Sequence, residues 1–135
     1  MSTFTHERLD VYRAGIDFIV AAEQIAAALP RGRGYMADQL RRAALSIALN
    51  TAEGAGEFAP ADKARFYRMA RRSGTECAAI LDACRVLGLS DDVQAGGGRA
   101  LLDRIVAMLT AMVRRVEKPD ADAGADADAG SEKEM

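Results

Sequence analysis

The spacing of the apolar residues is the feature that most limits what this chain can fold into. Four segments repeat apolar side chains every three or four residues, the period of an α-helix, and glycines or prolines separate them. We expect helices over residues 5–29, 35–57, 62–87 and 90–116. Half of the residues are apolar but only 5% are aromatic, so the core must be built from slender side chains. The 135 residues therefore predict one all-α domain of four helices packed on one another.

The ends and faces of these helices can also be predicted. Asp62 is expected to cap the third helix and Ser90 the fourth. Because each glycine within a helix costs about 1 kcal/mol relative to alanine, residues 96–98, all glycine, predict a break or a weak first turn in the fourth helix. The apolar side of the first helix is expected to consist of Leu9, Tyr12, Ile16, Ile19 and Val20.

Charge divides the chain into two parts. Residues 117–135 contain seven acidic residues and two lysines, a net charge of −5, whereas residues 1–116 carry a net charge of +3. The acidic part has no large apolar residue before Met135 and cannot bury enough surface to offset its ordering entropy. We therefore expect a four-helix domain over residues 1–116 and an acidic disordered tail over residues 117–135.

The compartment follows from the N-terminal region and from the cysteines. Asp10, Asp17 and Glu23 interrupt the stretch that would have to be apolar in a signal peptide, and no run is long enough to span a membrane. Cys77 and Cys84 are seven residues apart on a predicted helix, about 10 Å, which excludes a disulfide between them. We expect two small apolar core residues in a cytoplasmic protein.

A narrow polar stripe follows the second predicted helix, with apolar residues on both sides of it. A helix of this kind needs burial on two sides, so we expect one apolar flank to face the core and the other to face a second copy of the chain. The stripe would then lie along the seam between subunits, its polar groups paired within the chain or across the seam. The residues of this predicted polar seam are Gln39, Arg42, Ser46, Asn50 and Glu53, and Glu57 continues the stripe.

The alternative for the stripe is a ligand-binding or catalytic groove. Acid–base and nucleophilic catalysis need convergent groups, yet the only histidine, His6, is far from the stripe in sequence, and Ser46 has no evident activating base. We therefore expect no enzymatic activity, and no metal, cofactor or small-molecule substrate.

Arginines gather on one side of the third predicted helix, and they could form a phosphate-facing patch. The alternative is an ordinary solvated helix face, since Glu76 and Asp82 lie nearby and the body of the chain is only mildly basic. No pattern in this region reads bases, so any nucleic-acid binding would be directed at the backbone. The candidate nucleic-acid-binding residues are Arg65, Arg68, Arg71 and Arg72, together with Arg41, Arg114 and Arg115.

Two motifs resemble a known family. Residues 39–54 read Q-L-R-R-A-A-L-S-I-A-L-N-T-A-E-G, and residues 70–76 read A-R-R-S-G-T-E. They resemble the Q-L-R-R-A, S-I, N-x-A-E-G and A-R-G-S-x-x-E signatures of the bacterial four-helix bundle proteins first associated with intervening sequences in 23S ribosomal RNA genes. With L-D-V-Y at residues 9–12 and the predicted helix end at Leu87 and Gly88, the resemblance covers roughly residues 4–116.

This resemblance implies an antiparallel up-down four-helix bundle that assembles into a ring-like homopentamer. The chain is also similar, more distantly, to accessory proteins of diversity-generating retroelements, which implies RNA, DNA or a reverse-transcriptase-like protein as a partner. Three features depart from the family pattern: Arg72 stands where the family has glycine, which bears on how closely the second and third helices approach; glycines interrupt the fourth helix; and the acidic tail is additional. An acidic segment would compete with phosphates for a basic surface.

Overall fold

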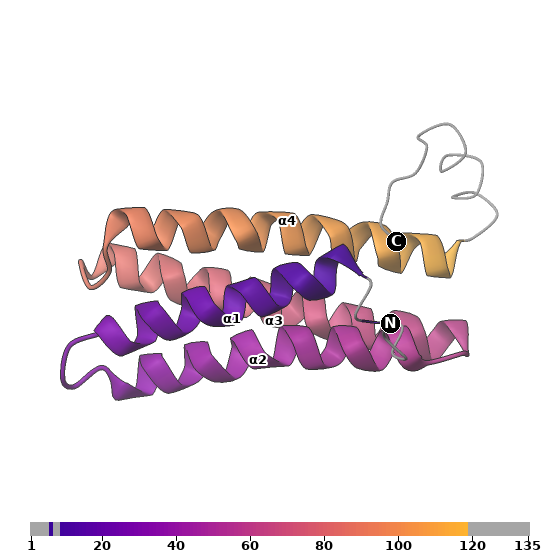
Figure 1. The fold of residues 1–135 in the computed structure, drawn as a ribbon, viewed down its shortest axis with the longest axis horizontal. Helices are drawn as coiled ribbons and strands as arrows, with labels where there is room; N and C mark the ends of the chain where they lie inside the picture. Colours follow the sequence, from indigo (N-terminus) through magenta and orange to yellow (C-terminus); the bar gives the residue numbers. More distant parts are fainter. Residues whose placement is uncertain (1–5, 7–8, 119–135) are drawn as a thin grey trace.

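The computed structural model describes residue 6 and residues 9–118, and it contains four α-helices with no strand in this part of the chain. They are α1 (Asp10–Ala28), α2 (Gly34–Gly56), α3 (Pro60–Val86) and α4 (Asp92–Glu117). Figure 1 shows the helices lying side by side, joined by short links at the two ends of an elongated molecule. The predicted all-α, four-helix fold is confirmed.

Each helix packs against two of the others. α1 lies against α2 and α4, and α3 lies against the same two helices, so α1 and α3 occupy opposite corners of the bundle. The core between them is built mainly from alanine and from aliphatic side chains, as the composition predicted. Its largest fully buried apolar side chains are Val11, Phe18, Ile25, Leu40, Ile47, Leu102, Ile105 and Leu109.

The predicted apolar face of α1 is partly wrong. Ile16 and Val20 are 40% and 57% exposed, while Leu9 and Ile19 are partly buried against the core. The face that packs inward instead combines small residues with Phe18 and Ile25. A Cβ at Gly15 would lie only 3.8 Å from the Cα of Ala48 on α2, so the small face allows a close approach that larger side chains would prevent.

The helix starts also differ from the predictions. α1 begins at Asp10, because Leu9 is already in an extended conformation. Pro60 is at the first turn of α3, where its missing N–H is harmless, so Ala59 occupies the N-cap position and Asp62 lies in the first turn instead of capping it. At the start of α4, the carboxylate of Asp91, and not Ser90, accepts a hydrogen bond of 3.0 Å from the N–H of Gln94.

Helix α3 ends where the sequence indicated. Gly88 has a φ of +67°, the left-handed conformation that glycine adopts without steric penalty. The N–H of Gly88 donates to the carbonyl of Arg85 (3.0 Å) and that of Leu89 to the carbonyl of Cys84 (2.8 Å). These two bonds form a Schellman motif, which satisfies carbonyls that the helix end would otherwise leave unpaired.

The predicted break in α4 is wrong, because the helix runs without interruption from Asp92 through residues 96–98. Three contacts compensate for the low helix propensity of the glycines: the Asp91 cap, an ion pair of 2.7 Å between Arg99 and Asp82 of α3, and the burial of Gly98. A Cβ at Gly98 would lie 3.5–3.6 Å from side chains of α1 and α3, so this glycine packs directly on the core.

Other predictions concern the cysteines, membranes and the tail. Cys77 and Cys84 are buried and free, as predicted. None of the helices described here has the length and apolar character needed to cross a membrane. The domain boundary was predicted after residue 116, and α4 ends at Glu117. Residues 119–135, which make up most of the predicted disordered tail, lie outside the described residues.

Candidate nucleic-acid interface and oligomer seam

The centre of the predicted polar seam lies at the contact between α2 and α3. The Nδ2 of Asn50 donates to the Oγ of Ser46 (2.9 Å) and to its carbonyl oxygen (3.0 Å), and the Oγ of Ser73 on α3 donates to the same Ser46 Oγ (2.9 Å). All three residues are at least half-buried. This part of the seam therefore pairs its polar groups within one chain.

The two edges of the seam differ from its centre. Gln39 donates a hydrogen bond to Glu76 of α3, again within the chain. Arg42 and Glu53 are exposed, and neither makes a hydrogen bond or an ion pair with any other described residue. Of the five predicted seam residues, these two are the ones whose charges remain available to a partner.

An open groove of about 440 Å³ runs beside the seam. Phe66 of α3 closes one side of it, a residue that the stripe on α2 alone could not indicate. The groove is therefore amphipathic and open to solvent. Its α2 lining consists of Arg42, Leu45, Ser46, Leu49, Asn50 and Glu53.

The two apolar flanks of α2 have different environments. The first flank is buried against the core, from Met36 through Leu40 and Ile47 to Gly54. On the second flank Ala48 is buried against α1, but Leu45 and Leu49 are 48% and 55% exposed.

Ile16 and Val20 on α1 are also exposed. They lie beside this second flank along the length of the bundle, because Gly15 lies against Ala48 and Glu23 pairs with Arg41. We call Ile16, Val20, Leu45 and Leu49 the α1–α2 apolar face. No described side chain covers it.

Arginines of α3 line a separate concave surface of about 260 Å³, which also includes Met69 and Thr75. Their spacing of three, four or one residues places them on one side of the helix, where Arg65, Arg68 and Arg72 are exposed and Arg71 is half-buried. We call this surface the arginine concavity. Its arginines are Arg65, Arg68, Arg71 and Arg72.

Acidic neighbours neutralise only part of the arginine concavity. Arg68 forms an ion pair with Glu117 at the end of α4, and Arg65 lies 3.9 Å from Asp62 with its guanidinium stacked 4.5 Å from the ring of Phe66. Arg71 and Arg72 have no side-chain partner among the described residues. Arg72, which replaces the glycine of the family pattern, is exposed and so does not separate α2 from α3.

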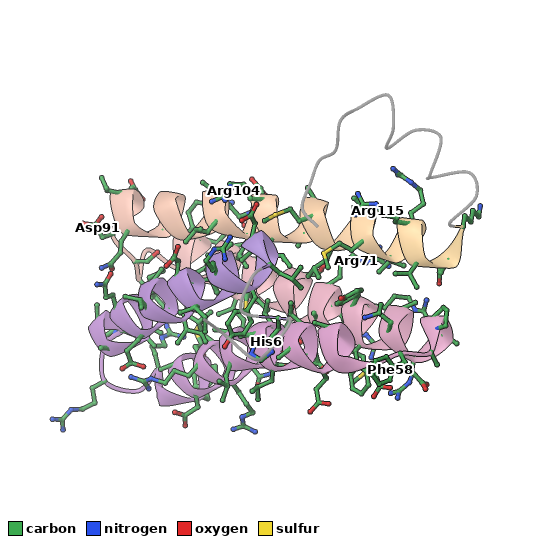
Figure 2. All side chains as sticks on the ribbon, turned by 45° about the vertical axis from the view of Figure 1, so that its right-hand side comes forward. His6, Phe58, Arg71, Asp91, Arg104 and Arg115 are labelled. Carbon is green, nitrogen blue, oxygen red and sulfur yellow. The ribbon has the colours of Figure 1, made fainter. Side chains whose placement is uncertain are left out.

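The two arginines near the end of α4 point in different directions. Arg114 is exposed and is turned by about 60° from Glu117, which faces the arginine concavity, whereas Arg115 is half-buried and turned by about 160°. Figure 2 shows Arg71 and Arg115 in the half of the bundle away from Asp91. By helical position, Arg114 thus lies nearer than Arg115 to the side of α4 that carries Glu117.

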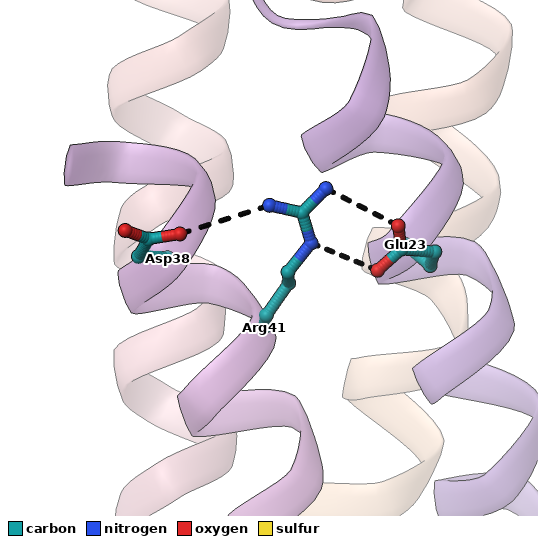
Figure 3. Close-up of polar contacts among 3 residues, drawn as sticks. All are labelled: Glu23, Asp38 and Arg41. Atoms are coloured by element: carbon teal, nitrogen blue, oxygen red, sulfur yellow. Dashed lines mark hydrogen bonds and ion pairs between the residues drawn. The ribbon is translucent and has the colours of Figure 1, made fainter. Parts of the chain in front are cut away.

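Arg41 belongs to a different part of the molecule. Its guanidinium bridges α2 to α1 through Glu23 (2.8 and 3.2 Å) and lies 3.7 Å from Asp38, as Figure 3 shows. The hydrogen bond to Arg41 holds the pKa of Glu23 below its usual value and raises the pKa of Arg41. The structure thus separates Arg41 from the other candidate arginines and gives it two acidic partners.

The reactive side chains are placed for packing. Burial, with a smaller contribution from Glu76, raises the pKa of the Cys77 thiol to about 12. His6 meets the ring of Tyr12 edge-on, with 4.6 Å between ring centroids. Among the residues that the structure describes, no group of three or more His, Cys, Asp and Glu side chains could hold a metal ion.

These features define a class of protein: a four-helix bundle with an uncovered apolar face on α1 and α2 and a separate arginine concavity on α3. The family model described as 23S rRNA-intervening sequence protein matches residues 7–111, and the chain belongs to this family. The resemblance drawn from the two motifs is thereby confirmed. No curated protein matches the sequence. Arg114, Arg115 and the acidic segment lie beyond the matched residues.

Proposed function

We propose that this protein is a non-enzymatic homo-oligomer that binds the phosphate backbone of RNA or DNA through its arginine concavity. The observation that carries the proposal is the pair Arg71 and Arg72, two guanidinium groups without described side-chain partners beside Arg65 and Arg68. A guanidinium group presents a rigid fork of N–H donors that matches phosphate oxygens. A reverse-transcriptase-like protein that holds nucleic acid is a partner consistent with this chemistry.

The binding proposed here is directed at phosphates and not at bases. The concavity is lined by four arginines with Met69 and Thr75, and it has none of the Asn or Gln side chains that recognise adenine in a groove. Such binding releases counterions and weakens steeply as the salt concentration rises. In an oligomer the concavity would be repeated, which would raise the apparent affinity for a long strand.

Self-association is supported by the α1–α2 apolar face. Four apolar side chains, each 40–57% exposed, lie together on neighbouring helices and have no cover within the described chain. A contiguous apolar surface of this kind is typical of an interaction site. The groove beside it adds Arg42 and Glu53, charges that a second copy could pair.

The finer assembly is an antiparallel up-down bundle in a ring-like homopentamer, as the family resemblance implies. Residue pairs support the up-down order, because partner numbers fall as residue numbers rise: Gln39 contacts Glu76 and Ser46 contacts Ser73. The buried free cysteines support a reducing compartment, and we place the protein in the cytoplasm.

The nucleic-acid proposal is tested by the double variant Arg71→Ala/Arg72→Ala. Labelled single-stranded RNA and DNA are titrated with the full chain at 50 and 200 mM salt. We expect at least a tenfold loss of affinity at 50 mM and a smaller salt dependence, since two phosphate contacts are removed. The control Arg31→Ala/Arg104→Ala removes the same charge from exposed sites outside the concavity. Equal losses of affinity in both variants would mean that the effect arises from net charge alone, which would contradict binding at the concavity.

The oligomer proposal is tested by light scattering on Leu45→Glu/Leu49→Glu. We expect the native chain to have a mass near five chains and the variant to have a mass near one. The control Val86→Glu/Val93→Glu alters two residues that are 75% and 85% exposed near the link between α3 and α4, and should leave the mass unchanged. A native chain that is monomeric at micromolar concentration would contradict the proposal.

A second candidate function is a purely structural or protein-interaction oligomer without affinity for nucleic acid. The ion pairs of Arg65 and Arg68 favour it, because they occupy half of the arginines in the concavity. It predicts a stable oligomer that binds neither RNA nor DNA at 50 mM salt. The titration above therefore decides between the two functions.

A further inference from the structure

The end of α4 lies beside the arginine concavity. Glu117, the last residue of that helix, forms an ion pair with Arg68 of α3. The chain therefore leaves the bundle at Lys118 from the edge of the surface on which Arg71 and Arg72 lack described partners. Whatever follows residue 118 starts next to these two guanidinium groups.

The segment that follows has the charge of a phosphate mimic. Residues 119–135 contain six acidic residues and one lysine, a net charge of −5, and the acids are spread along the whole segment. Carboxylates and phosphates compete for guanidinium groups through the same charge-assisted hydrogen bonds. The charge of the segment is thus complementary to the arginine concavity and opposite to what a nucleic-acid-binding extension would carry.

The segment is long enough to reach across the whole arginine concavity. Its 17 residues could span about 55 Å when fully extended, at roughly 3.3 Å per residue. The concavity extends only from Arg65 to Thr75, about 15 Å along the helix. A tether of this size holds its acids at a local concentration on the order of millimolar, without any further contact.

We propose that residues 119–135 dock on the arginine concavity of the same bundle and compete there with nucleic acid. The docking itself is a contact between carboxylates and guanidinium groups and does not depend on the proposed function. Only its consequence, weaker binding of nucleic acid, rests on that function. The ion pair between Glu117 and Arg68 holds the end of α4, which precedes this segment, beside the concavity. Basic partners or high salt release the segment, whereas a longer nucleic-acid strand displaces it by engaging several subunits.

The experiment uses the full chain with Asp120, Asp122, Asp126 and Asp128 all changed to Asn, which keeps the length of the segment. Amide ¹H–¹⁵N spectra of the native chain and this variant are compared without nucleic acid. We expect shifts concentrated in residues 65–75, and loss of this difference when both proteins also carry Arg71→Ala/Arg72→Ala. A control, Asp17→Asn/Asp92→Asn, neutralises exposed acids that do not line the concavity and should leave residues 65–75 unchanged.

The same proteins are then titrated with a labelled single-stranded RNA at 50 and 200 mM salt. We expect the Asn variant to bind about tenfold more tightly at 50 mM, with a smaller gain at 200 mM because salt screens the competing contact. Spectra and affinities that match the native chain would overturn the docking while leaving the proposed function intact. Shifts in residues 65–75 without RNA binding by any form would support the docking and overturn the proposed function.

Discussion

Gly54 of α2 lies directly against the ring of Tyr67 on α3. A Cβ at residue 54 would be 2.6 Å from Cε1 of Tyr67 and 2.7 Å from its Cδ1, closer than unbonded carbon atoms approach each other. Tyr67 is only 4% exposed, so its ring has little freedom to move away. The Nζ of Lys63 donates to the carbonyl of Gly54 (2.8 Å) on the same turn. The glycine that ends the N-x-A-E-G motif thus sets how closely α2 and α3 approach.

Gly54→Ala is therefore expected to destabilise the fold. Alanine favours a helix over glycine by about 1 kcal/mol, but overpacking against a buried ring costs typically 1–3 kcal/mol, and we expect the clash to dominate. Urea unfolding followed by circular dichroism should show a lower midpoint. Gly56→Ala, where a Cβ would meet no atom within 4 Å, is the matched control and should not lower it. An unchanged midpoint for Gly54→Ala would mean that Tyr67 moves freely.

Gly97→Ala is expected to have the opposite effect. Gly97 is exposed within α4, and a Cβ there would have no neighbour within 4 Å. The substitution should raise the free energy of unfolding by roughly 0.5–1 kcal/mol, because it removes the entropic penalty of glycine in a helix. Thermal unfolding at a fixed protein concentration measures the gain. A loss of stability would show that a partner, such as a second subunit, approaches the backbone at this point.

The features of the fold that depend on the residues of a single helix were predictable from the sequence. The features that depend on packing between helices were not. Periodicity gave four helices and their approximate ends, and Gly88 marked the end of α3 correctly. The first helix, however, has apolar residues on two sides, and only packing against Ala48 selects the slender side. The glycines of α4 likewise looked like a break because the burial of Gly98 against other helices is invisible in a single-helix pattern.

The candidate site was predictable in the same limited sense. The polar stripe and the arginines of α3 followed from helical spacing, yet their partners lie on other helices. Ser73 pairs with Ser46, and Glu23 neutralises Arg41, through the register between helices, which no local pattern contains. Phe66 completes the groove for the same reason. The sequence could not decide whether Ser90 or Asp91 is the N-cap of α4, since both residue types cap helices.

Asp91→Ala should destabilise α4 by about 1 kcal/mol. The substitution removes the acceptor for the N–H of Gln94 and a negative charge that favours the positive end of the helix dipole. Ser90→Ala is the matched control, because its buried Oγ makes no hydrogen bond with the described chain and its removal is neutral or favourable. Urea unfolding of both variants should separate them by at least half of that amount. Equal losses of stability in the two variants would contradict the assignment of Asp91 as the sole capping residue.

Alkaline pH is expected to destabilise the bundle through Cys77. Burial and Glu76 raise its pKa to about 12 in the folded chain, while a thiol in the unfolded chain titrates near its ordinary value of about 8.5. Between these values the folded state binds more protons than the unfolded state, so the free energy of unfolding falls as the pH rises. Each pH unit within this window removes up to about 1.4 kcal/mol for this thiol. Below about pH 7 the thiol is neutral in both states and contributes almost no pH dependence.

The variant Cys77→Ala isolates this contribution. At pH 7 the variant is less stable than the native chain only because it buries slightly less volume. The quantity to compare is the slope of the unfolding free energy against pH between pH 8 and pH 10. Tyr67, whose pKa burial also raises to about 12, supplies part of the slope in both proteins, mainly towards the upper end of the range. We expect the slope of the variant to be shallower by about 1–2 kcal/mol over the two pH units. Parallel curves for the two proteins would contradict this prediction, because they would mean that the buried Cys77 ionises as readily in the bundle as in the unfolded chain.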